Sequence, residues 1–214
     1  RLKAVAVRNG GDLLLGVPLR PAPGVYYNSV ISLGASPPAG YDKVHLVPFG
    51  EFVPPGFGWI VRVLSIPLSD FSRGRTDQRP LLAAGERVAV NICYEDAYGA
   101  EIVRQLPEAT LLVNVSNVAW FGDSLAPAQH LQIARMRALE TGRMYLTATN
   151  TGITAAVGAD GAVLARLPQF AEGRLEVEAR GRTGTTPYVR FADWLALVLS
   201  AAMLLFFALR GRSR

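Results

Sequence analysis

The C-terminal part of the chain contains sixteen consecutive uncharged residues, Trp194 to Leu209, and only Ser200 among them is polar. As an α-helix this stretch is about 24 Å long, and the three residues before it extend the helix to about 28 Å, close to the ~30 Å hydrocarbon core of a bilayer. Apolar side chains on all sides disfavour a helix that lies flat on a membrane. We therefore expect a transmembrane helix over residues 189–209, with a helix buried in a soluble core as the alternative.

The flanks of this stretch predict its orientation. Three arginines follow it within residues 210–214, and such charges are enriched on the cytoplasmic side of transmembrane helices. Tyr188 and Trp194 lie where aromatic side chains line a membrane interface. We expect residues 210–214 to be a basic cytoplasmic tail and residues 1–190 to lie on the outer side of the membrane.

The rest of the chain has the composition of a folded domain. The 214 residues are 50% hydrophobic and 18% charged, which excludes a disordered chain, a coiled coil and a collagen-like repeat. The formal net charge is +5, but three of these charges are the terminal arginines, so we expect no nucleic acid partner. The single cysteine excludes a disulfide framework and a multi-cysteine metal site.

Strands alternate with helices along the chain, which indicates a layered α/β fold. Pro127 in the first turn and Gly142 at the end predict a helix over residues 127–141. Another helix is expected to begin directly after Cys93, and the residues after Arg1 have a strand-like pattern. Residues 18–24 predict a turn and residues 54–86 a long connection. The other expected strands are residues 13–17, 25–33, 87–93, 110–115, 144–149, a hairpin over 154–167 with its turn at 160–161, and 174–179.

Cys93 lies where a predicted buried strand ends and a helix begins. Amide groups at a helix N-terminus stabilise a thiolate, so this position suits a nucleophile. The alternative is a small buried hydrophobic residue, which is the role of most lone cysteines. Glu95 and Asp96 would raise the pKa of the thiol, so a nucleophile here needs a nearby cation.

Lys43 is the candidate for that cation, because it is one of only two lysines and lies in the apolar segment YDKVHLVPFGE. Its ammonium group could stabilise a thiolate and a developing oxyanion, although a lysine extending to the surface is the alternative. His45 and His130 are the only histidines, and either could activate a thiol as a base. Two histidines without a third ligand do not predict a metal site, and we expect no cofactor.

Seven segments resemble, in order, the carbon–nitrogen hydrolase (nitrilase) superfamily, and within it more closely the apolipoprotein N-acyltransferase family. They are YDKVHLVPFGEFVP at 41–54, FSRGRTDQ at 71–78, NICYED at 91–96, LLVNVSNVAWFG at 111–122, QHLQIARMRALETGR at 129–143, TNTGITA at 149–155 and TPYVRFADW at 186–194. The resemblance implies an αββα sandwich for residues 1–188, on the periplasmic side of the bacterial inner membrane. The implied reaction moves an acyl chain from a membrane phospholipid, through a cysteine thioester, to the N-terminal amine of a diacylglyceryl-cysteine apolipoprotein.

The family uses a Glu–Lys–Cys triad, and by motif match Lys43 and Cys93 are two of its members. The general-base glutamate of the family precedes the lysine motif, but no glutamate precedes Glu51 in this chain. Since the chain also starts at Arg1, we expect a truncated N-terminus rather than loss of activity. Glu51 and Glu95 match two further acidic positions, which we expect to orient Lys43 and to support the intermediate.

The resemblance also implies residues that contact substrate. Tyr94, Trp120 and Phe121 are expected to line a pocket, and one departure lies beside them: Val118 stands where the family typically has aspartate. In the long connection, Phe57, Trp59, Ile60 and Val61 are expected to form a lid that enters the outer leaflet.

Two other functions fit the same residues. One is a membrane-anchored nitrilase-like amidase, in which water accepts the acyl group. The other is a non-catalytic module tethered to the membrane, since the base is absent from the chain.

Overall fold

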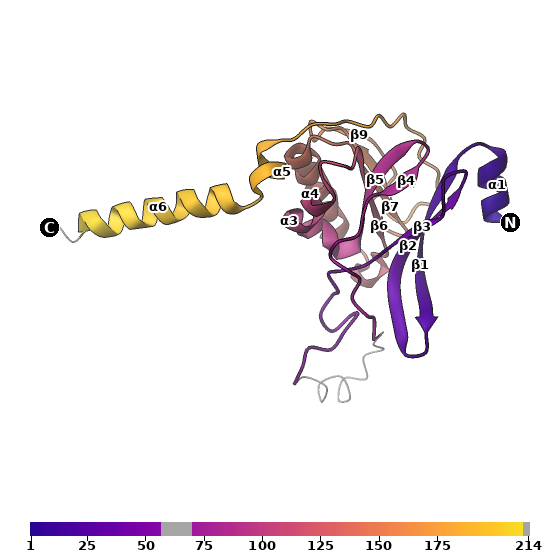
Figure 1. The fold of residues 1–214 in the computed structure, drawn as a ribbon, viewed down its shortest axis with the longest axis horizontal. Helices are drawn as coiled ribbons and strands as arrows, with labels where there is room; N and C mark the ends of the chain where they lie inside the picture. The colour runs from indigo at the N-terminus through magenta and orange to yellow at the C-terminus, as the bar shows by residue number, and fades with distance from the viewer. Residues whose placement is uncertain (57–69, 212–214) are drawn as a thin grey trace.

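The computed structural model describes residues 1–56 and 70–211, which form two stacked β-sheets with helices around them (Figure 1). The strands are β1 Asp12–Ala22, β2 Val25–Gly34, β3 Ala39–Asp42, β4 Leu81–Ala83, β5 Glu86–Ile92, β6 Leu111–Ser116, β7 Tyr145–Thr149, β8 Ala155–Val157 and β9 Val163–Arg166. The α-helices are α1 Leu2–Arg8, α3 Gly99–Ile102, α4 Ala126–Thr141, α5 Pro187–Phe191 and α6 Trp194–Gly211, and the 3-10 helices are η1 Cys93–Ala97, η2 Val103–Gln105 and η3 Ala119–Phe121.

The small sheet has the order β1-β2-β3, and all its pairs are antiparallel. The two predicted strands of its hairpin are confirmed, but the turn is shorter than expected. Pairing continues through Leu19 opposite Tyr27 and closes with Ala22 opposite Val25. Proline is tolerated here because β1 is an edge strand, where a missing N–H interrupts no ladder.

The large sheet has the order β4-β5-β6-β7-β8-β9, and β5, β6 and β7 run parallel. This confirms the expected strands in the middle of the chain and the hairpin of β8 and β9. The carboxyl ends of parallel strands meet at one edge of a sheet, and loops there carry functional side chains in α/β proteins. Cys93 follows β5 at this edge.

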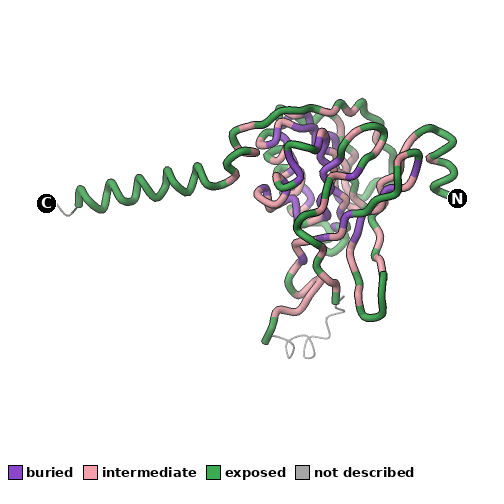
Figure 2. Tube along the Cα trace, viewed as in Figure 1, coloured by how far each residue is buried: buried purple, intermediate pink, exposed green. Residues whose placement is uncertain are grey.

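The two sheets pack face to face around a cluster of buried hydrophobic residues, and Figure 2 shows that the buried residues gather in the strands. Val30 of the small sheet and Val90 of the large sheet belong to this core. A Cβ at Gly16 would lie 2.9 Å from Val115 Cγ1, so the close approach of β1 to β6 requires glycine there.

Helix α4 covers the other face of the large sheet through Ala134 and Ala138, which pack against Leu112 and Tyr145. Gly142 ends this helix in the left-handed conformation, as predicted. The order of sheet, sheet and helix is that of the expected α/β sandwich.

Three local predictions were wrong. Residues 2–8 form helix α1, which contains two alanines, the residue with the strongest helix preference. The segment after Cys93 is not one helix but the short pieces η1, α3 and η2. Residues 174–179 form no strand, because neither sheet offers them a ladder partner in the described part of the chain.

The C-terminal helix α6 begins at Trp194, five residues later than the predicted span of residues 189–209. Ala192, with φ of 44°, separates α5 from α6, and α6 then runs through 18 residues, or about 27 Å. Among the described residues α6 is the one helix that is long and apolar enough to cross a membrane, and it is exposed along its length (Figure 2).

Candidate active site

Cys93 occupies a strained turn between β5 and η1. Its φ is 53°, in the left-handed region that non-glycine residues rarely adopt, and such strain is typical of functional sites. The side chain is half-buried, and Sγ lies 3.9 Å from the carbonyl oxygen of Asn117. The predicted position of this thiol at the end of a strand is confirmed, and a short 3-10 helix stands where the sequence predicted a longer helix.

Lys43 follows β3, the last strand of the small sheet, and its side chain is buried with only 1% exposed. This excludes the alternative of a surface lysine. Nζ lies 2.7 Å from Glu51 Oε2, and that oxygen also accepts a hydrogen bond from the amide of Val47 at 2.8 Å. The other carboxylate oxygen accepts from Asn28 Nδ2 at 2.8 Å. Glu51 is therefore fixed on both oxygens and holds the ammonium group in place.

Glu95 joins the segment that carries Lys43 to the turn at Cys93. Its Oε1 accepts hydrogen bonds from the amides of Val44 and His45 at 2.7 and 3.0 Å and from the hydroxyl of Tyr41 at 3.1 Å. Its Oε2 accepts from the amide of Ile92 at 2.7 Å. Burial raises the pKa of this carboxyl, and the backbone hydrogen bonds and Lys43 oppose that shift. One side chain thus connects the end of β5 to the segment that follows β3.

The groups around Cys93 shift the pKa of its thiol in opposite directions. Burial raises the pKa of its thiol most, and the carboxylates of Asp96 and Glu51 raise it further. The ammonium of Lys43 and the backbone N–H of Tyr94 lower it. The net effect is upward, so at neutral pH the thiol form predominates and a base must take its proton. Lys43 has the offsetting effect that the sequence predicted for a cation.

Both histidines contact carboxylates. His45 Nδ1 lies 3.3 Å from Glu101 Oε1, and its ring stacks on Tyr98 with centroids 3.6 Å apart. His130 Nδ1 lies 2.5 Å from Asp96 Oδ2. Within residues 1–56 and 70–211, neither ring forms a hydrogen bond with Cys93, so the geometry does not favour histidine as the base.

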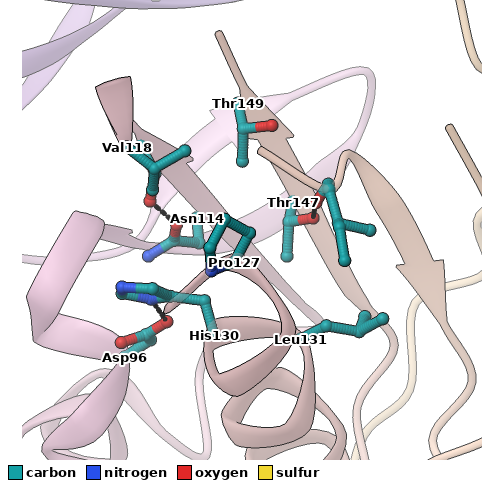
Figure 3. Close-up of a pocket in the computed structure, with 10 residues that line it drawn as sticks. Asp96, Asn114, Val118, Pro127, His130, Leu131, Thr147 and Thr149 are labelled. Carbon is teal, nitrogen blue, oxygen red and sulfur yellow. Dashed lines mark hydrogen bonds and ion pairs between the residues drawn. The ribbon is translucent and has the colours of Figure 1, made fainter. Parts of the chain in front are cut away.

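A small cavity lies behind the turn at Cys93, between α4 and the ends of β6 and β7 (Figure 3). Its volume is about 10 Å³, room for about one water molecule. Val118 lines it and is buried, and its amide donates to Asn150 Oδ1 at 3.1 Å. Asn114, on the cavity wall, donates to the carbonyl oxygen of Cys93 at 3.1 Å.

The expected pocket residues lie at the surface. Trp120 is 69% exposed and Phe121 is 47% exposed, on η3. The hydroxyl of Tyr94 accepts a hydrogen bond from Tyr98 at 2.8 Å, and the Tyr94 ring is exposed. The expected lid residues lie outside the described part of the chain: they are Phe57, Trp59, Ile60 and Val61.

Sequence reasoning missed the Asp96–His130 pair and the bond from Asn114 to the nucleophile backbone. These partners are separated by 34 and 21 residues, so no local spacing indicates the contacts. In the part of the chain that the structure describes, no three His, Cys, Asp or Glu side chains are grouped to hold a metal ion.

Comparison with known proteins gives a consistent result. The sequence profile of the carbon–nitrogen hydrolase family matches residues 1–188. The apolipoprotein N-acyltransferase of Nitrosomonas europaea is 58% identical over 198 residues, which are 91% of this chain and 40% of that protein. That of Bordetella bronchiseptica is 48% identical over 230 residues, covering 97% of this chain and 42% of the relative. The chain thus spans about two fifths of the length of these relatives.

Solved structures share the fold at low identity. A carbon–nitrogen hydrolase from Helicobacter pylori G27 superposes with a TM-score of 0.62 at 19% identity, covering 80% of this chain and 63% of the other. An amidase from a Nesterenkonia species superposes with a TM-score of 0.60 at 21% identity, covering 81% and 62%. These likenesses support the αββα sandwich of the nitrilase type.

Proposed function

The chain belongs to the carbon–nitrogen hydrolase family, and from that premise we propose that residues 1–188 are the thiol-dependent acyl-transfer domain of an apolipoprotein N-acyltransferase. The observation that carries the proposal is the ion pair between the buried Lys43 and Glu51, whose ammonium charge lowers the pKa of Cys93 across the two sheets. The relatives of 58% and 48% identity with that name support the choice within the family.

In the first step the thiolate of Cys93 attacks the ester carbonyl carbon of a membrane phospholipid. A carbon–sulfur bond forms, the ester carbon–oxygen bond breaks, and a protonated lysophospholipid leaves. A covalent intermediate divides one difficult transfer into two easier ones. Since the raised pKa keeps Cys93 protonated, the step needs a general base, and we assign this role to a carboxylate outside the 214 residues of this chain.

In the second step the α-amine of a diacylglyceryl-cysteine lipoprotein attacks the thioester. The amide bond forms, the carbon–sulfur bond breaks, and Cys93 regains its proton. Both steps develop negative charge on the former carbonyl oxygen, which Lys43 Nζ and the backbone N–H of Tyr94 would hold. Loss of one such donor typically lowers a rate by about 10²–10³-fold.

The membrane arrangement is part of the proposal. Helix α6 would anchor the domain in the bacterial inner membrane, with residues 1–188 on the periplasmic side and the C-terminal arginines in the cytoplasm. The exposed apolar surface of α6 supports the anchor, and the arginines after it support the orientation. A membrane-anchored domain has direct access to a phospholipid donor.

The test is the mass of the intact protein. The full gene product that contains this chain is expressed in membranes beside a Cys93→Ala variant, and both are measured before and after hydroxylamine. We expect an acyl adduct on the wild type only, and hydroxylamine should remove it because it cleaves thioesters. A folded, membrane-inserted wild type without an adduct would contradict the proposal.

The acceptor is tested separately. The acylated protein is mixed with a synthetic diacylglyceryl-cysteine peptide, and the peptide mass is followed. We expect the acyl group to move to the peptide amine. Release of free fatty acid at the same rate with and without the peptide would instead indicate an amidase-like enzyme that uses water.

A further inference from the structure

Two adjacent carboxylates follow Cys93, and they hold its turn on two different elements. Glu95 bonds to the segment that carries Lys43. Asp96 Oδ2 instead lies 2.5 Å from His130 Nδ1 on α4, and Figure 3 shows the two side chains facing each other. The backbone after the nucleophile is therefore held from the small-sheet side by one residue and from the helix side by the next.

His130 stabilises the buried carboxylate of Asp96. Asp96 is only 2% exposed, and burial raises the pKa of the carboxyl. The hydrogen bond and charge of His130 oppose this, with a smaller effect from Arg137. Asp96 Oδ1 has no hydrogen-bond partner among the described residues. Removal of the partner of a buried carboxylate leaves an uncompensated group, which is strongly destabilising.

The pair lies directly behind the nucleophile. Asp96 and His130 line the same small cavity as Asn114, whose side chain donates to the carbonyl oxygen of Cys93. Of the 10 described residues that line this cavity, Asp96 alone is acidic. The charge of Asp96 also reaches the sulfur, since it raises the pKa of Cys93.

We propose that Asp96 and His130 act as one positioning unit, which fixes the strained turn at Cys93 so that its sulfur faces the substrate carbonyl beside Lys43. The inference rests on the proposed function, because it assigns the pair a role in the same acyl transfer. Neither side chain contacts the reacting atoms, and both act through the backbone of η1. A small displacement of a nucleophile lowers reaction rates strongly, by about 100-fold for 1 Å.

The test uses Asp96→Asn, His130→Gln and the double variant in the full gene product in membranes. The rate of acyl-enzyme formation is measured with a phospholipid donor. Each single variant should lower this rate about 10- to 100-fold. The double variant should be no slower than the slower single variant, because residues that act as a unit are not additive. Rates that fall independently and multiply in the double variant would contradict a single unit.

A second measurement separates positioning from loss of structure. The pH profile of Cys93 alkylation by iodoacetamide should move to lower pH in Asp96→Asn, because the variant removes a negative charge that raises the thiol pKa. The thiol would thus ionise more readily while acylation slows. An unchanged alkylation profile would contradict the influence of the Asp96 charge on the pKa of Cys93.

Glu101→Gln is the matched control. This variant changes the other described carboxylate–histidine contact of this region, between Glu101 and His45. Both of these side chains are partly exposed. We expect acylation at the wild-type rate. If Asp96→Asn does not fold, His130→Gln breaks the same bond from its more exposed side and decides the question. No acyl-enzyme in the wild type would contradict the proposed function, whereas equal rates in wild type and variants would contradict only this inference.

Discussion

The ammonium group of the buried Lys43 and the carboxylate of the partly exposed Glu51 form an ion pair 2.7 Å long between residues eight positions apart. The pair stands in one loop of the small-sheet side, yet its charge acts on Cys93, which follows a strand of the large sheet. Removing one partner of a buried pair leaves the other uncompensated, so each residue depends on the other.

Glu51→Gln keeps the shape of the side chain but removes the counter-ion of Lys43. Lys43 then loses the carboxylate that holds its ammonium group in place, and we expect acyl-enzyme formation to slow by about 10²-fold. Mass spectrometry of the membrane protein in samples quenched at set times measures the rate. Asn28→Ala, which removes only the outer hydrogen bond of Glu51, should have a smaller effect. A wild-type rate in Glu51→Gln would show that the ion pair is not needed.

The pKa of the Cys93 thiol should lie above its ordinary value of 9.0, because burial is the largest influence on this pKa and raises it. Lys43→Met removes the charge that lowers this pKa, so the midpoint of the alkylation profile should move to still higher pH. Iodoacetamide labelling between pH 7 and 11 measures both midpoints. A lower midpoint in the variant would contradict the geometry.

The same pKa has a consequence for stability. The folded state holds the thiol proton more tightly than the unfolded state, so this contribution is complete below pH 9.0 and is lost as pH rises through the folded-state pKa. Cys93→Ala should therefore flatten the decline of the free energy of unfolding in alkaline solution. Equal slopes for wild type and variant, in denaturant titrations above pH 9, would count against the raised pKa.

Gly74→Ala should displace the lysine segment. A Cβ at this position would lie 2.2 Å from the carbonyl oxygen of Asp42, and the amide of Gly74 donates to the carbonyl of Lys43 at 2.8 Å. Overpacking against backbone destabilises by about 1–3 kcal/mol, so the unfolding temperature should fall together with the acylation rate. Gly11→Ala is the control, since nothing lies within 4 Å of its Cβ position. Equal unfolding temperatures in the two variants would contradict the close contact.

Glu95→Gln should loosen the connection between the two sheets. The carboxylate accepts four hydrogen bonds, and the amide side chain cannot accept those made to both oxygens. Each buried donor left unsatisfied costs about 1–3 kcal/mol, so thermal unfolding in detergent should begin at a clearly lower temperature. Hydrogen exchange should rise first at the amides of Val44 and Ile92. Protection there equal to the wild type would contradict the role of Glu95 as a connector.

The sequence predicted those elements whose signals are local. Pro127 and Gly142 mark the ends of one helix, and the Asp160–Gly161 turn marks a hairpin, because each acts through its own backbone preferences. The strand predicted over residues 174–179 failed because a strand also needs a neighbouring ladder, which local alternation cannot reveal.

The site likewise contains features that local sequence predicts and features that depend on distant residues. The position of Cys93 at the end of a strand followed from its neighbours in sequence. The contact between Asp96 and His130 joins residues 34 positions apart and depends on how α4 lies on the sheet. A carboxylate next to a nucleophile was visible, but its partner was not.

Lys43 follows the last strand of the small sheet and Cys93 follows β5 of the large sheet, so neither sheet contains a reactive centre by itself. The nucleophile acquires its cation only when the two sheets stack through a core that includes Val30 and Val90. The reactivity of the Cys93 sulfur therefore depends on correct packing of the two sheets. A substitution deep between the sheets would therefore change the reactivity of Cys93 before it unfolds the strands.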